Sequence, residues 1–319
     1  MSDIDPEIAI ETLDKIDMRI RNGHDPSEIL ESLNVTQELL DDWLDRYCAP
    51  PDFSDIIRGS GLLNAVTPLF EESQDGQLEQ TASGVLVGIG DAVFCLTATH
   101  CYAPSAKKPL YLPGADGIIP MNGRYFIDPH RMVGTTRDTV DSGFCRLDPD
   151  IAELATQRFP PISIDRFLFT DHWEHGDLYT FCGYPWRKTK KTGKTHLSDF
   201  VSFTGHSYPE SFHDGNNLDT HVNIAIRLRR KKTYSSRHQS YQTAPLPHGI
   251  SGGPIFAWAP YMEDRCDPDN LMLGGIGHTF WEKKNCLVGT RMIPIAMAIM
   301  ISEPDLRPNF PQILQEILN

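Results

Sequence analysis

Residues 249–254 read Gly-Ile-Ser-Gly-Gly-Pro, and no other stretch of the chain is as specific. Glycine adopts backbone conformations that other residues avoid, so the glycines on both sides of Ser251 permit a tight turn there. Such a turn directs backbone N–H groups into the space beside the serine hydroxyl. Acyl transfer through a serine nucleophile requires that arrangement.

The same letters satisfy the G-x-S-x-G turn of α/β-hydrolases, in which the serine lies between a strand and a helix. Two features argue against that fold. The proline and apolar residues at 254–256 predict the start of a strand, and only 68 residues follow Ser251. An α/β-hydrolase places both its acid and its histidine after the serine. The partners of Ser251 are therefore expected upstream.

Two upstream stretches supply a histidine and an acid. Residues 94–101 read Phe-Cys-Leu-Thr-Ala-Thr-His-Cys, an apolar strand that ends at His100 and would hold the imidazole at the edge of a cleft. Residues 141–147 read Asp-Ser-Gly-Phe-Cys-Arg-Leu and place Asp141 directly before another apolar run. An imidazole that takes the serine proton, and a carboxylate that orients the imidazole, are the usual companions of a serine nucleophile.

Together with Ser-Gly-Val-Leu-Val at 83–87, these stretches resemble the chymotrypsin-like (trypsin-like) serine peptidases, in particular bacterial-type intracellular members. In that family a Ser-Gly strand precedes a Thr-Ala-x-His-Cys element, and histidine, aspartate and serine follow in that chain order. Asp141 matches the family's register, whereas Asp138 and Asp148 do not. Gly-Tyr-Pro at 183–185 resembles a second-barrel turn of bacterial members.

The resemblance covers about residues 60–300 and implies a mainly β fold of two six-stranded antiparallel β-barrels. The first barrel would span about 60–150 and the second about 173–300, with a C-terminal helix at about 308–319. Short apolar runs cut by glycine agree with an all-β barrel or sandwich, and a tight Gly90-Asp91 turn joins the first two. These runs lie at 84–89, 92–97, 178–183, 199–203, 219–228, 254–258, 272–277 and 286–292.

The resemblance also implies roles for individual residues. Ser251 would be the nucleophile, His100 the general base, and Asp141 the group that fixes the imidazole tautomer. The N–H groups of Gly249 and Ser251 would form the oxyanion hole. The implied activity is that of a serine endopeptidase, which cleaves protein or peptide substrates through an acyl-enzyme and needs no cofactor. No metal is expected, since His-Trp-Glu-His at 172–175 lacks the spacing of a helical zinc pair.

The chain departs from secreted members of the family. Ile250 stands where digestive members carry an aspartate that holds a cleaved N-terminus, and the chain has no Ile-Val-Gly-Gly start. Activation by that route is therefore not expected. The family's disulfide partner of Cys101 would fall near Val85, so that bridge is not expected either.

The residues implied for the specificity pocket contain no aspartate, which disfavours substrates with Arg or Lys at the cleaved bond. They are Pro245, Gly275, Gly277 and His278. His278 has two interpretations. It is either a determinant for acidic substrate side chains, as a histidine is in glutamate-cleaving relatives, or a hydrogen-bonded polar residue on a terminal strand.

Residues 1–50 form a separate acidic segment, with thirteen Asp and Glu against four Lys and Arg. Cap residues and helical spacing predict three short helices, and residues 26–44 resemble a helix-turn-helix. Acidic side chains would face the phosphates of a bound DNA, so nucleic-acid binding is not favoured. They are Glu38, Asp41, Asp42 and Asp45. The segment is expected to bind a regulatory protein or to pack on the rest of the chain.

The whole-chain composition agrees with a cytoplasmic globular protein. The formal net charge is −14, the start has no apolar signal, and no run of eighteen apolar residues occurs, so no membrane contact is expected. The seven cysteines lack paired spacing and are expected to be reduced. Two alternatives to an active peptidase remain open: a catalytically inactive, protease-like binding module, and a DNA-linked regulator that acts through its N-terminal helices.

Overall fold

The computed structural model describes most of the chain after residue 59 and short parts of it before. The described residues are 11–12, 15–16, 26–36, 39, 57, 59–102, 109–126, 140–170, 178–186, 189–192, 195–198, 200–228, 230, 233–235, 240–244, 246–258 and 268–318. The chain divides into two compact units, residues 1–53 and 54–319. Each unit is described by itself.

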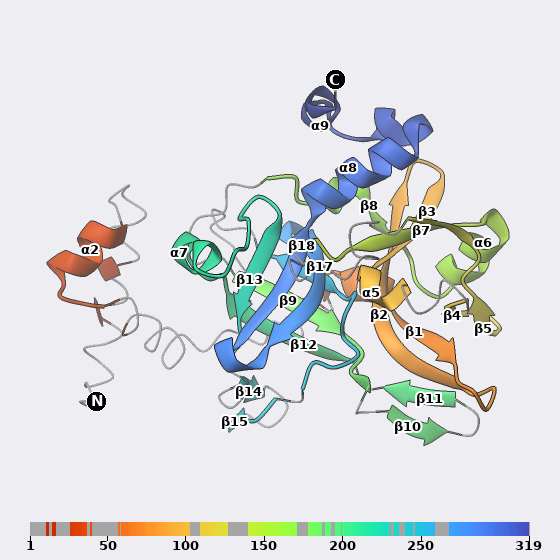
Figure 1. Ribbon diagram of the computed structural model, residues 1–319, viewed down its shortest axis with the longest axis horizontal. Helices are drawn as coiled ribbons and strands as arrows, with labels where there is room; N and C mark the ends of the chain where they lie inside the picture. Colours follow the sequence, from red (N-terminus) through yellow and green to blue (C-terminus); the bar gives the residue numbers. More distant parts are fainter. Residues whose placement is uncertain are drawn as a thin grey trace. The chain divides into compact units, whose positions relative to one another are not determined.

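The second unit is mainly β and contains two curled antiparallel sheets (Figure 1). The strands of the first sheet are β1 (Val66–Glu72), β2 (Leu78–Ile89), β3 (Ala92–Thr97), β4 (Tyr111–Gly114), β5 (Gly117–Pro120), β6 (Gly123–Phe126), β7 (Gly143–Leu147) and β8 (Ile162–Ser163). Those of the second are β9 (Leu178–Gly183), β12 (Val201–His206), β13 (Asn223–Arg227), β16 (Pro254–Ala257), β17 (Met272–Trp281) and β18 (Cys286–Arg291).

Two short hairpins and a few helices complete the described elements. The hairpins pair β10 (Thr189–Thr192) with β11 (Thr195–Ser198), and β14 (Thr233–Ser235) with β15 (Ser240–Gln242). The α-helices are α2 (Pro26–Ser32), α5 (Thr99–Tyr102), α6 (Pro149–Thr156), α7 (Glu210–Asp214), α8 (Met292–Ser302) and α9 (Gln312–Ile317). Short 3-10 helices lie at Leu62–Ala65, Ile164–Arg166, Pro268–Asn270, Glu282–Lys284 and Pro304–Asn309.

The first sheet has the strand order β5-β4-β1-β2-β3-β7-β6, and β8 pairs with β2 in parallel. The predicted strands at 84–89 and 92–97 are confirmed, and Gly90 makes the turn between them with φ of +61°. The expected count of six strands is wrong for this sheet. The β4–β5 hairpin extends it beyond β1, and residues 162–163 run alongside β2, so it has seven antiparallel strands and one short parallel strand.

The second sheet has the strand order β12-β9-β16-β17-β18-β13, which is the six strands expected. An antiparallel bridge joins Ser207, directly after β12, to Ile226 in β13, so the two edge strands of the sheet meet. Each sheet encloses its own apolar core. The first core contains Leu69, Leu86, Leu112 and Phe159, and the second contains Tyr179, Phe181, Ile226 and Ile255.

Two helices, α8 and α9, lie in the last part of the chain, and α9 falls within the helix expected at about 308–319. Helix α8 follows β18 directly, and α9 comes after the 3-10 turn at Pro304–Asn309 (Figure 1). Glu303, between them, is only 4% exposed. Its carboxylate binds the guanidinium groups of Arg124 in β6 and Arg146 in β7. These ion pairs fasten the C-terminal helices to the first sheet.

The first unit is described only in part. Helix α2 buries Ile29 and Leu30, and the hydroxyl of Thr36 accepts a hydrogen bond from the Leu39 N–H at 3.2 Å. Thr36 therefore caps a following segment as predicted. The rest of the predicted three-helix arrangement lies largely on residues outside the described ones. None of the described helices has the length and apolar character needed to cross a membrane.

The described cysteines are buried free thiols. They are Cys95, Cys101, Cys145, Cys182 and Cys286. Burial raises the pKa of the Cys95, Cys145, Cys182 and Cys286 thiols, which keeps them protonated. These four side chains therefore act as small buried apolar groups.

Replacing the buried carboxylate tests how the C-terminal helices are held. We expect Glu303→Gln to lower the free energy of unfolding by roughly 1–3 kcal/mol, because Arg124 loses its charged partner and Arg146 loses one of its two carboxylates. The matched control is Glu282→Gln, which removes an exposed ion pair with Arg230 and should change stability by less than about 0.5 kcal/mol. Urea unfolding measures both. Equal effects of the two substitutions would contradict this account of the C-terminus.

Candidate active site

Ser251 lies in a turn that only glycine can complete. Gly249 and Gly252 have φ of +85° and +86°, a region that side chains with a Cβ rarely adopt. Space excludes a side chain as well. A Cβ on Gly252 would lie 1.8 Å from the hydroxyl oxygen of Thr97 in β3. The sequence pattern around Ser251 therefore reflects both backbone conformation and close contact with the first sheet.

Hydrogen bonds within and around the turn fix the direction of two of its N–H groups. The carbonyl group before Gly249 accepts a hydrogen bond from the Trp186 N–H at 2.8 Å, and the carbonyl before Ser251 accepts one from the Gly253 N–H at 2.9 Å. In a trans peptide the N–H points opposite to the C=O, so the N–H groups of Gly249 and Ser251 point away from these donors. Within the described part of the chain, neither N–H donates to a protein acceptor.

Ser83 of β2 holds this turn against the first sheet. Its N–H donates to the Ser251 carbonyl at 2.9 Å, and its hydroxyl donates to the Gly249 carbonyl at 3.2 Å. The same hydroxyl accepts from the Tyr184 N–H at 2.9 Å, and the Ser83 carbonyl accepts from the Thr97 hydroxyl at 2.6 Å. Ser83 is completely buried, so water does not compete for these bonds.

A buried carboxylate orients His100, which lies in α5 directly after β3. The His100 Nδ1 is 2.7 Å from Asp141 Oδ2, and the backbone N–H of His100 donates to Asp141 Oδ1 at 3.1 Å. Asp141 precedes β7, and its own N–H donates to the Thr290 hydroxyl at 3.2 Å. The Asp141 side chain is fully buried, whereas that of His100 is 43% exposed. One carboxylate therefore holds His100 through two bonds, one to the ring and one to the backbone, and leaves the other edge of the imidazole open.

The surroundings of His100 shift its protonation. Partial burial lowers the pKa of the imidazole, because it disfavours the cation. The hydrogen bond and the charge of Asp141, together with the neighbouring Cys101 thiol, outweigh that effect. The pKa of His100 is therefore raised above its ordinary value of about 6.5.

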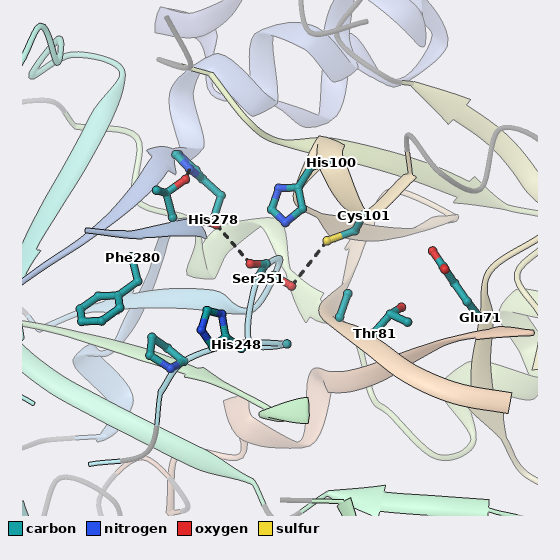
Figure 2. Close-up of a pocket in the computed structure, with 12 residues that line it drawn as sticks. Glu71, Thr81, His100, Cys101, His248, Ser251, His278 and Phe280 are labelled. Carbon is teal, nitrogen blue, oxygen red and sulfur yellow. Dashed lines mark hydrogen bonds between the residues drawn. The ribbon is translucent and has the colours of Figure 1, made fainter. Parts of the chain in front are cut away.

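These groups surround one cavity of about 460 Å³. Figure 2 shows the His100 imidazole over Ser251, with Phe280 and His248 on one side and Cys101, Thr81 and Glu71 on the other. The Ser251 hydroxyl donates to the carbonyl oxygen of His278 at 3.1 Å. The structure thus brings the three predicted residues together: His100 and Ser251 line the cavity, and Asp141 supports His100 from the interior.

The residues expected for a specificity pocket have different positions. Pro245 lies outside the described residues. Gly275 and Gly277 are not among the residues that line the cavity. They instead allow close strand packing, since a Cβ would lie 2.3 Å from the Thr290 carbonyl oxygen at Gly275 and 2.2 Å from the Phe181 ring at Gly277.

His278 lines the cavity, but its side chain is almost completely buried beside Asp141. It is 1% exposed, and its Nδ1 lies 3.8 Å from Asp141 Oδ2 and 2.8 Å from the Thr279 hydroxyl oxygen. An imidazole in that position cannot contact a substrate side chain. The hypothesis that His278 selects acidic substrates is therefore not favoured, and the contacts agree with the other interpretation, a hydrogen-bonded polar residue.

Several residues of the cavity wall were not predicted. Phe280 follows His278 by two positions in β17 and lines the cavity, but the register shift at His278 interrupts the alternation that could have indicated it. The turn residues Pro247 and His248 lie directly before Gly249 and could have been expected from that proximity. Glu71 and Thr81 come from β1 and β2, and only the register of those strands brings them to the cavity. Sequence spacing carries no signal for that register.

The chemistry available at the cavity involves no evident metal site. Among the described side chains, no group of three or more His, Cys, Asp and Glu lies close enough together to hold a metal ion. The His-Trp-Glu-His stretch at 172–175 falls outside the described residues. The arrangement of a serine hydroxyl, a carboxylate-bound imidazole and two inward N–H groups suits acyl transfer.

The sequence matches no protein-family model, and no curated protein matches it. The chemistry of the site therefore follows from its own contacts: His100, Gly249 and Ser251 line one cavity, and the buried carboxylate of Asp141 supports the imidazole from the interior.

Proposed function

We propose that the chain is a chymotrypsin-like serine endopeptidase that hydrolyses peptide bonds through an acyl-enzyme at Ser251. The observation that carries this proposal is the bonding around His100. Its Nδ1 is held by the buried Asp141 at 2.7 Å, and its other edge opens into the cavity that Ser251 lines. The chain order His100, Asp141, Ser251 and the two curled antiparallel sheets agree with this family of enzymes.

In the first step, Ser251 attacks the carbonyl carbon of the substrate's peptide bond. A rotation of the hydroxyl from the His278 carbonyl toward His100 brings the proton to Nε2. As Oγ bonds to the carbonyl carbon, Nε2 takes the hydroxyl proton and the carbonyl π electrons move to the oxygen. The negative oxygen then accepts hydrogen bonds from the N–H groups of Gly249 and Ser251, which have no protein acceptor among the described residues.

The tetrahedral intermediate then collapses to the acyl-enzyme. The oxygen regains its double bond, the C–N bond breaks, and the leaving amine takes the proton from His100 Nε2. A water molecule repeats the sequence: His100 removes its proton, the hydroxide oxygen bonds to the acyl carbon, and the proton returns to the Oγ of Ser251 as the carboxylic acid departs. Asp141 stabilises the imidazolium in both halves of the cycle without itself taking the proton.

Preorganisation of the N–H donors contributes the largest part of such catalysis. Each oxyanion donor is worth roughly 3–4 kcal/mol in related chemistry. Here the preceding carbonyls are bonded to Trp186 and Gly253, and Ser83 ties the turn to the first sheet. The donors therefore need no rearrangement when charge develops on the substrate oxygen.

Covalent labelling separates an active peptidase from an inactive, protease-like binding module. A fluorophosphonate should modify Ser251 of the wild-type chain once, as located by mass spectrometry, and Ser251→Ala should abolish the modification. The control Ser302→Ala, which changes a hydroxyl in α8, should be labelled like the wild type. A folded wild-type protein that resists the reagent would favour the binding module.

The pH dependence of labelling should follow His100. The rate falls as pH decreases through the His100 pKa, since only the neutral imidazole accepts a proton, and the midpoint should lie above the ordinary value of about 6.5. Asp141→Asn removes the charge that stabilises the imidazolium, so its midpoint should move to lower pH. Labelling rates measured from about pH 5 to about pH 10 test both expectations. A midpoint that Asp141→Asn leaves unmoved, or moves upward, contradicts the assignment.

The Ser83 hydroxyl should matter for rate and not only for stability. Ser83→Ala leaves the carbonyl of Gly249 and the N–H of Tyr184 without their shared partner, so the labelling rate should fall about tenfold or more. Thr204→Val, the control, removes a hydroxyl that bonds Thr180 in β9 at 2.8 Å, away from the turn. It should lower stability by a similar amount, about 1 kcal/mol, and leave the labelling rate unchanged. Equal rates in the two variants would count against the role of Ser83.

A further inference from the structure

His278 occupies an irregular position in β17. On its N-terminal side Gly277 pairs with Gly289 of β18, and on its C-terminal side Thr279 pairs with Val288. Two neighbouring residues of β18 thus face three residues of β17, and His278 is the extra one. A bulge of this kind redirects a side chain, and bulges are frequent beside active sites. Here the bulge turns the imidazole of His278 toward the interior.

Through this bulge, His278 contacts two members of the site at once. Its carbonyl oxygen accepts the Ser251 hydroxyl at 3.1 Å (Figure 2). Its imidazole lies against Asp141, with Nδ1 3.8 Å from Oδ2. The same carboxylate oxygen binds His100 at 2.7 Å. Two imidazoles therefore share one fully buried carboxylate, one of them reaching the cavity and the other enclosed.

The charge of Asp141 decides which His278 tautomer is stable. A lone pair on Nδ1 would face the carboxylate oxygen and be repelled, whereas an N–H there is attracted. The Nδ1–H also reaches the Thr279 hydroxyl oxygen at 2.8 Å. The titratable groups on this side of the site are Asp141, which lies beside the imidazole, and His100 beyond it. Cys101, Glu71 and His248 line the same cavity, and the Thr279 and Thr290 hydroxyls are neutral.

We propose that His278 is a positioning residue for the proposed peptidase reaction, in which its neutral, Nδ1-protonated imidazole shares the charge of Asp141 with His100. The inference rests on the proposed function, because it concerns how strongly Asp141 holds the proposed general base. The Nδ1–H of His278 beside the Asp141 carboxylate compensates part of the negative charge of Asp141. Less of that charge then acts on His100, and the imidazole of His100 gives up its proton to the leaving amine more readily.

A purely structural role for His278 makes a different prediction. If the imidazole only fills space, an apolar residue of similar size should leave the protonation of His100 unchanged. If it supplies an N–H, Asn should replace it, because the side-chain nitrogen of Asn can occupy the place of Nδ1. His278→Leu and His278→Asn therefore form a matched pair.

The test is an NMR titration of His100, carried out in the full chain with Ser251→Ala so that no turnover contributes. We expect His278→Leu to raise the His100 pKa by roughly half a unit to one unit, and His278→Asn to restore it close to the reference value. The imidazole nitrogen shifts of the reference protein should show His278 as the neutral Nδ1–H tautomer. An unchanged His100 pKa in His278→Leu overturns the proposal. An Nε2–H tautomer of His278 in the reference protein overturns it as well, and that measurement does not require the His278 variants to fold.

Fluorophosphonate labelling of the same variants with Ser251 intact separates this inference from the proposed function. The pH midpoint at which the labelling rate falls on the acid side should rise in His278→Leu by the change in His100 pKa that NMR records. In His278→Asn this midpoint should return to the wild-type value. If His278→Leu is labelled normally and its pH midpoint is unchanged, the role of His278 is refuted and the peptidase proposal still stands. If His278→Leu changes the His100 pKa but no reagent labels Ser251 of the wild type, the peptidase proposal is refuted. The proposal that both imidazoles share the charge of Asp141 then still stands.

Discussion

The site depends on the burial of one negative charge. Asp141 is fully enclosed, and a carboxylate in such surroundings is stable only when hydrogen-bond donors surround it. His100 supplies two of those donors, its ring Nδ1 and its backbone N–H. The need to satisfy the carboxylate therefore fixes the imidazole in one tautomer and one orientation. His278 stands beside the same carboxylate, so the second sheet also takes part in compensating the charge.

The nucleophile turn belongs to the second sheet but is held by the first. Ser251 comes three residues before β16, yet its carbonyl and that of Gly249 bind Ser83 in β2. Gly252 fits against Thr97 in β3 only because it lacks a side chain. These contacts hold the N–H groups of Gly249 and Ser251 in place without a ligand. The fold and the proposed chemistry thus depend on the same few contacts between β2, β3 and the turn.

Local patterns predicted the parts of this arrangement that lie on single stretches of chain. The hairpin at 84–97 follows from apolar runs around Gly90, and the glycines flanking Ser251 indicate the turn, because these signals arise from backbone conformation alone. The specificity pocket could not be predicted in the same way. His278 faces Asp141 because of a bulge, and Glu71 reaches the cavity through the register of β1. Both features depend on partners distant in sequence.

His100, Asp141 and Ser251 are proposed to act as one unit. Non-additive effects of substitutions on the rate of labelling test this most directly. The rate of fluorophosphonate labelling of Ser251 would be compared in His100→Ala, Asp141→Asn and the double variant. If Asp141 acts only through His100, the double variant should react about as slowly as His100→Ala alone. Rate losses that multiply in the double variant would show two independent effects and contradict the account.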